Sequence, residues 1–180
     1  MTPPVETTVN GRAADNCAMC ADGREPRDSH MRRYEATIHY SLLEEGPVQT
    51  LSSPPKVVEY MRGAFDELPL SEQFWVILLD RRNHPMGRHR ISVGTATSTL
   101  AHPREVFRAA VLGSAACVVL VHNHPSGMPE PSAADIALTR QMREAGKVLD
   151  IQVLDHVVIG SDIDDPMGRG WYSFREAGPL

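Results

Sequence analysis

The sequence has few cysteines, no long apolar run and no excess of basic residues. Three cysteines among 180 residues are a small, odd number, which excludes a disulfide framework and fits a reducing compartment. The longest apolar runs cover residues 74–79 and 115–121, far short of the roughly 18 residues that suggest a membrane-spanning helix. The first residues lack the basic start and apolar stretch of an export signal. We therefore expect a cytoplasmic protein with no membrane partner.

The charge balance argues against a broad nucleic-acid-binding surface. Eighteen Lys and Arg face 23 Asp and Glu, so the formal net charge is −5 and the pI is about 5.9. A local basic patch remains compatible with this balance. The segment from Arg81 to Arg90 (RRNHPMGRHR) contains Pro and Gly among four arginines. It is typical either of a solvated turn or of a phosphate-binding or partner-binding patch.

The first 33 residues contain almost no large aliphatic side chains, so they offer little surface to bury. We expect them to form a disordered tail, and residues 34–180 to form one domain. Cys17 and Cys20 have zinc-finger spacing, but only Asp28 and His30 lie near them in sequence, and a structural zinc site needs four ligands. A second metal site there is not favoured.

Hydrophobic periodicity and turn residues predict alternating strands and helices. Strands are expected at residues 34–43, 72–80, 88–99, 115–121, 148–154, 156–159 and 171–174. Helices are expected from near Ser53 to before Pro69, from Pro103 to Gly113, and over residues 132–145 with Gly146 as the terminator. This order, without an internal repeat, indicates an α/β fold with a mixed β-sheet flanked by helices.

His122, His124 and Asp135 form the strongest candidate site. Side chains at i and i+2 at the end of a strand point to the same side, so both imidazoles can converge while Asn123 faces away. Asp135 is expected in the first turn of the following helix. Two His and one carboxylate leave a fourth tetrahedral position for water, which is the pattern of a catalytic zinc site.

A purely structural interpretation fits the same residues. Ser132 followed three positions later by Asp135 resembles a capping box in which Asp replaces the usual Glu or Gln. His-x-His pairs at strand ends can also be incidental. Spacing alone does not separate helix capping from metal binding.

The chain resembles the RadC family, a bacterial branch of the JAMM (MPN-plus) zinc metalloprotease-like domains. The JAMM signature HxHx7SxxD is satisfied at every position by His122, His124, Ser132 and Asp135. Further matches across residues 55–175 are Pro125-Ser126-Gly127, Gly94-Thr95, His102-Pro103-Arg104-Glu105, Leu154-Asp155-His156 and Tyr172-Ser173-Phe174. Longer RadC-like proteins carry a helix-hairpin-helix DNA-binding region before this domain, and the sequence shows no equivalent.

The resemblance implies the JAMM/MPN fold, which is related to the cytidine deaminase architecture, and one Zn²⁺ per chain held by His122, His124 and Asp135. It further implies that Glu72 acts as the general base and that Ser132 helps to hold the oxyanion of the tetrahedral intermediate. Glu105, near the start of its helix, is the second candidate for the base. Asp155 and His156 are expected where two strands meet, and supporting the site, forming a structural turn and direct catalysis all remain open for them.

Two functions from different classes follow. The first is a zinc-dependent hydrolase that cleaves peptide or isopeptide bonds in a peptide or protein substrate. The alternative is a RadC-like partner-binding module in DNA repair or DNA metabolism, without hydrolytic activity and with only weak or indirect DNA association. An HNH nuclease is excluded because its residues are spread over a ββα unit, and a zinc deaminase is excluded because no PCxxC segment follows. The substrate and the oligomeric state are not indicated.

Overall fold

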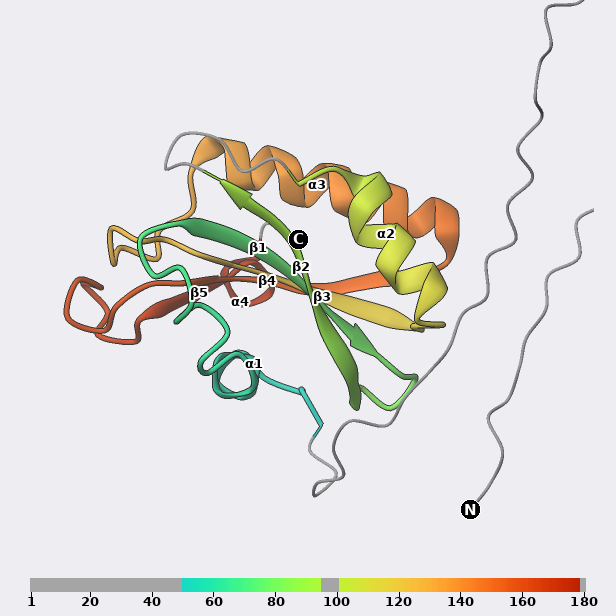
Figure 1. The fold of residues 1–180 in the computed structure, drawn as a ribbon, viewed down its shortest axis with the longest axis horizontal. Coiled ribbons are helices and arrows are strands. Elements are labelled where there is room, and N and C mark those ends of the chain that lie inside the picture. Colours follow the sequence, from blue (N-terminus) through green and yellow to red (C-terminus); the bar gives the residue numbers. More distant parts are fainter. Residues whose placement is uncertain (1–49, 95–100, 179–180) are drawn as a thin grey trace, which may run out of the picture. The chain divides into compact units, whose positions relative to one another are not determined.

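The computed structural model of the protein describes residues 50–94 and 101–178. The helices and strands of this part, in chain order, are α1 (Pro54–Tyr60), β1 (Glu72–Leu79), β2 (Pro85–Gly94), α2 (Pro103–Leu112), β3 (Cys117–Asn123), α3 (Ala133–Leu149), β4 (Gln152–Ile159), β5 (Trp171–Ser173) and α4 (Phe174–Ala177) (Figure 1). The predicted tail, the strand expected at residues 34–43 and the Cys17/Cys20 pair lie outside the described residues.

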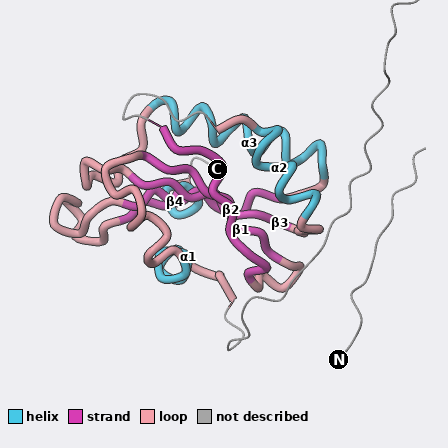
Figure 2. The backbone as a smooth tube through the Cα atoms, in the orientation of Figure 1, coloured by secondary structure: helices cyan, strands magenta, loops and turns pink. Residues whose placement is uncertain are grey.

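The strands form one mixed sheet in the order β2-β1-β3-β4-β5. Figure 2 shows these strands in magenta and the helices in cyan. Only β3 and β4 run parallel among these neighbours, and α3 makes the crossover between them, as a parallel connection requires. The predicted α/β class with a mixed sheet flanked by helices is confirmed.

Each face of the sheet buries its own apolar cluster. On one face, β1 and β3 side chains such as Phe74 and Leu120 pack with Val106 of α2 and Met142 of α3. On the other, Ile77 and its neighbours pack with α1. Figure 1 shows α2 and α3 over one side of the strands and α1 on the other. The alternation along β1 and β3 assigns His122 to the α2/α3 face.

Each of the first three helices begins where the sequence predicts. Ser53 precedes Pro54, and His102 precedes Pro103, a placement that suits proline because the first helical N–H needs no partner. The His102 side chain accepts a hydrogen bond from the backbone N–H of Arg104. Ser132 caps α3 with the complete predicted capping box.

The end of α3 differs from the prediction. Gly146 is buried within the helix rather than terminating it, and a Cβ placed there would lie 2.5 Å from the Ile151 carbonyl oxygen. The glycine therefore allows the backbone at Ile151 to pack closely against the helix. The helix continues to Leu149, and Asp150 takes the left-handed conformation with φ 55°, which short polar residues tolerate.

Two further expectations about strands are wrong. The predicted break between Leu154 and His156 does not exist, because Gln152–Ile159 form one continuous strand. The arginine-rich segment is only partly a turn, because β2 already begins at Pro85 and carries Arg88 and Arg90. No helix in the described segments combines the length and apolarity needed to cross a bilayer.

Candidate metal centre

The end of β3 positions the two histidines. All residues of Cys117–Asn123 are buried, so this central strand is held on both faces. His122 is fully buried and His124 follows the strand, half-buried. The Asn123 side chain points away, accepting a hydrogen bond from the backbone N–H of Gln73 at 2.7 Å and donating to the Ser71 carbonyl at 3.1 Å. The predicted alternation at the strand end is therefore confirmed.

The start of α3 positions Asp135. Its Oδ2 accepts hydrogen bonds from the backbone N–H and the hydroxyl of Ser132, at 2.7 and 2.6 Å. In return the Ser132 hydroxyl oxygen accepts from the Asp135 backbone N–H at 3.2 Å. Asp135 caps its helix and also reaches the histidines, so the two interpretations of this residue are compatible.

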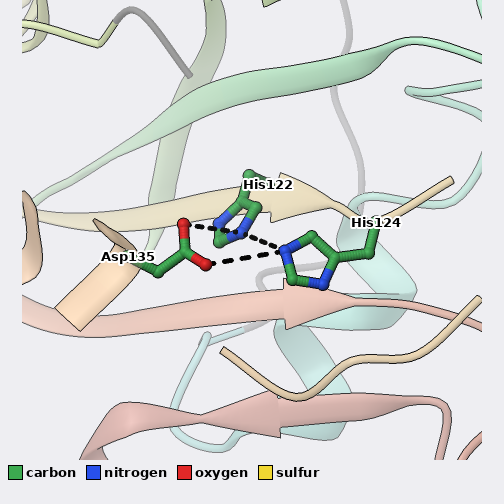
Figure 3. Close-up of side chains that lie close together, drawn as sticks. All are labelled: His122, His124 and Asp135. Carbon is green, nitrogen blue, oxygen red and sulfur yellow. Dashed lines mark hydrogen bonds and ion pairs between the residues drawn. The ribbon is translucent and has the colours of Figure 1, made fainter. Parts of the chain in front are cut away.

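His122, His124 and Asp135 converge on one point. The Nε2 atoms of the two imidazoles lie 3.0 Å apart. In Figure 3 the carboxylate turns one oxygen toward each ring, with Oδ1 3.3 Å from His122 Nε2 and Oδ2 3.6 Å from His124 Nε2. Among the described residues, these three alone form a group of His, Cys, Asp or Glu whose candidate ligand atoms all lie within 4.8 Å of one another.

The chemistry of this donor set fits a metal cation. His124 Nδ1 lies 2.8 Å from the Met128 carbonyl oxygen, and a carbonyl can only accept, so Nδ1 carries the proton. In the neutral ring, Nε2 then presents a lone pair toward His122 and Asp135. A ligating histidine whose other nitrogen donates to a backbone carbonyl is the usual arrangement in metal sites. The residues could therefore hold a metal ion.

The pKa values reflect this crowding. Burial lowers the pKa of His122 to about 4, while the adjoining Asp135 carboxylate raises the pKa of His124. Burial alone would raise the pKa of Asp135, but His124, His122 and Ser132 outweigh burial and hold it well below its usual range. Asp135 is thus a carboxylate at neutral pH and His122 a neutral imidazole, which are the protonation states that metal binding needs.

Glu72 begins β1 beside these residues. Antiparallel pairing sets Phe74 opposite His122, and continuing that register by two residues places Glu72 opposite His124. Burial raises the pKa of the Glu72 carboxyl, His124 opposes this shift and Asp135 adds to it. The carboxyl therefore interacts electrostatically with both residues. The alternative base, Glu105, instead forms an ion pair with Arg108 at 2.6 Å on its own helix.

Asp155 and His156 occupy opposite faces of β4 and have separate partners. Asp155 accepts hydrogen bonds from the Ser173 hydroxyl at 2.7 Å and the Arg175 backbone N–H at 3.0 Å, which tether the start of α4. His156 lies on the other face, with its Nε2 2.8 Å from His122 Nδ1. The structural turn expected here is wrong, because both residues lie within β4, and of the two only His156 contacts a candidate ligand.

Sequence reasoning did not find Thr139, whose hydroxyl contacts both Asp135 and His156. Its spacing was the available signal, because a residue four positions after Asp135 lies on the same helix face. Cys117 is a buried core residue, and its thiol contacts the Asp80 carbonyl at 3.5 Å.

A strand that ends in two converging histidines, opposite an acidic helix start, defines a JAB-type domain with a candidate metal triad. The chain belongs to the RadC-like JAB domain family, whose model matches residues 51–179. It is 43% identical over 132 residues to a UPF0758 protein of Thermosynechococcus vestitus, and 45% identical over 130 residues to those of Rubrobacter xylanophilus and Symbiobacterium thermophilum.

The matches cover 72–73% of this chain but only 50–53% of those three relatives. The chain thus spans about half the length of the curated relatives it matches.

Proposed function

We propose that the domain is a zinc-dependent hydrolase of peptide or isopeptide bonds. The observation that carries this proposal is the convergence of two imidazole nitrogens and a carboxylate next to Glu72. Three protein ligands with a remaining position for water are typical of catalytic zinc sites, whereas structural sites use four protein ligands. A zinc ion bound there would supply Lewis acidity, polarising a carbonyl and letting water ionise near neutral pH.

Glu72 would act as the general base. A carboxyl whose pKa is raised by burial is a stronger base than an exposed glutamate and can take a proton from water. The same group can then return that proton to the leaving amine. Its position opposite His124 supports this assignment over Glu105, whose carboxylate is engaged by Arg108.

Ser132 would assist through its hydroxyl. The hydroxyl proton is directed at Asp135 Oδ2, so it must turn toward the substrate to stabilise a developing oxyanion. The backbone N–H of Ser132 also donates to Asp135 Oδ2, so the helix cap is not lost when the hydroxyl turns.

The arginine-rich segment from Arg81 to Arg90 gives little support to the partner-binding alternative. Arg88 donates to the Tyr60 carbonyl at 2.7 Å and stacks over the Tyr60 and Trp75 rings. Arg90 forms an ion pair with Glu67 at 2.6 Å. These contacts engage two of the four arginines with neighbouring groups of the protein, which leaves fewer guanidinium groups for DNA phosphates.

The test is hydrolysis by the zinc-loaded protein. Purified protein would be screened against fluorogenic peptides and isopeptide-linked conjugates, with a chelator-treated sample and Glu72→Gln in parallel. We expect cleavage that is lost on chelation and restored by zinc. A metal-loaded protein that cleaves no amide in either class would contradict the proposal and favour the partner-binding module.

A further inference from the structure

His156 sits between the candidate ligand His122 and Thr139. Its Nε2 lies 2.8 Å from His122 Nδ1, and its Nδ1 lies 2.6 Å from the Thr139 hydroxyl oxygen. His156 and His122 are both fully buried, and the His156 ring stacks on Phe174 with centroids 4.9 Å apart. The packing therefore holds both ring nitrogens of His156 on these two partners.

The contact between Thr139 and Asp135 sets the direction of each of these hydrogen bonds. The Thr139 hydroxyl lies 2.6 Å from the backbone carbonyl oxygen of Asp135. That carbonyl can only accept, so the single hydroxyl proton points to it. The Thr139 oxygen is then the acceptor for His156, and the proton between them belongs to His156 Nδ1.

The position of the proton on His156 in turn decides which nitrogen of His122 carries a proton. His156 is fully buried, and burial disfavours a charged imidazole. A neutral His156 with its proton on Nδ1 has a lone pair on Nε2. The bond to His122 must therefore use the proton on His122 Nδ1. The lone pair of His122 then lies on Nε2, the nitrogen that faces His124 and Asp135. A cation there, or in its absence a proton on His124 Nε2, separates these acceptor atoms.

The reverse direction is unfavourable at one identifiable contact. If Thr139 donated to His156, its oxygen would lie 2.6 Å from the Asp135 carbonyl oxygen with no proton between the two acceptors. His156 would then donate to His122, whose proton would move to Nε2 and block the position where a cation would bind. The two directions thus correspond to a binding-competent and a binding-incompetent His122.

We propose that Thr139 and His156 are positioning residues that fix the tautomer of His122, so that its Nε2 keeps a lone pair for the metal. The inference rests on the proposed metal site for its function, but the tautomer is a property of the protein chain alone. Asp135 contributes twice in this account. Its carboxylate is a candidate ligand, and its backbone carbonyl orients a second ligand through Thr139 and His156.

The first test needs no metal. Histidine ring nitrogens of the metal-free protein, labelled with ¹⁵N, would be assigned by long-range ¹⁵N–¹H correlation at mildly alkaline pH. We expect the protons of His122 and His156 on Nδ1 in both rings. A proton on Nε2 of His122 would overturn the inference whether or not the protein binds zinc.

The second test compares Thr139→Val with Thr139→Ser. Valine keeps the shape of threonine but removes the hydroxyl, while serine keeps the hydroxyl. We expect Thr139→Val to weaken zinc binding by about 10- to 100-fold, the usual effect of losing a group that orients a metal ligand, and to move His122 toward the Nε2-protonated form. Thr139→Ser should retain wild-type affinity and tautomer.

The controls separate the inference from the proposed function. Thermal melting of each metal-free variant checks that the fold is retained. A wild-type affinity and tautomer in a folded Thr139→Val would overturn the positioning role. If wild-type protein with the expected tautomer bound no zinc, the proposed function would fail while the tautomer assignment would stand.

Discussion

The side chain of Asn123 holds the backbone on both sides of Glu72. Its Oδ1 accepts from the N–H of Gln73, and its Nδ2 donates to the carbonyl of Ser71. Because Asn123 lies between the two histidines on the opposite face of β3, one strand end both presents the imidazoles and fixes the start of the strand that carries the candidate base.

Asn123→Ala should therefore reduce hydrolysis more than zinc binding. Removing the amide leaves the buried Gln73 N–H without its partner, and an unsatisfied buried group costs about 1–3 kcal/mol. We expect lower unfolding free energy and a fall in kcat, with zinc content close to wild type. Urea unfolding, elemental analysis and kinetics on one preparation measure all three. A variant that loses zinc but keeps its stability would contradict this role.

Glu72→Gln should abolish most activity and spare the metal. The substitution keeps the shape of the side chain and removes the proton acceptor, so the hydrolytic rate should fall by about two to four orders of magnitude, the usual contribution of a general base. Zinc content and melting temperature should remain close to wild type.

Glu105→Gln is the matched control for that experiment, because it makes the same chemical change on α2. We expect nearly full activity from it. If Glu105→Gln lost activity while Glu72→Gln kept it, the assignment of the base would be wrong although the zinc mechanism would survive.

Acidification should destabilise the metal-free protein. His122 has a folded pKa of about 4 against about 6.5 in an unfolded chain, and His156 is shifted in the same direction. The unfolded chain therefore takes up protons first. The stability associated with the neutral rings is fully present above about pH 6.5 and is lost as the pH falls toward 4.

For His122 alone this loss is on the order of 3 kcal/mol. His124 has a raised pKa and acts in the opposite direction. Its contribution stabilises the folded protein as the pH falls through the pKa of His124 in the folded state. Unfolding by urea at a series of pH values, with a chelator present, measures the net slope. Stability that rises steadily from pH 6.5 to 4 would show that the two rings are not held neutral.

Gly146→Ala should destabilise the fold although alanine favours helices. The added Cβ would lie 2.5 Å from the Ile151 carbonyl oxygen and 3.2 Å from the Phe107 ring. We expect a net loss of about 1–3 kcal/mol, typical of overpacking, despite the roughly 1 kcal/mol that alanine gains over glycine in a helix. Lys147→Ala, on the exposed side of the same turn, should change the unfolding free energy little.

The fold class and the triad were predictable because they depend on local patterns. Apolar runs mark β1 and β3, and the His-x-His spacing at a strand end requires both rings to share a face. The start of α3 was readable from Ser132 and Asp135 because a capping box is a contact within four residues.

The errors occur where distant segments decide the local structure. Gly146 resembles a helix terminator until Ile151 and Phe107 are seen packed against it. Asp155 and His156 resemble a turn because two polar residues interrupt an apolar run, yet Ser173 and His122 satisfy them within a strand. The i, i+4 spacing places Thr139 on the same helix face as Asp135, but its contact with His156 and that of His156 with His122 join α3, β4 and β3, and local spacing does not reveal these.

Elemental analysis of purified protein, alongside the variants His122→Ala and Asp135→Ala, tests the central claim most directly. The exposed His89 on β2 supplies the control, since His89→Ala removes an imidazole without touching the triad. The account predicts one zinc per chain in the wild type and in His89→Ala, and none in the two triad variants. Two zinc ions per chain, or zinc retained by both triad variants, would contradict it and direct attention to Cys17 and Cys20.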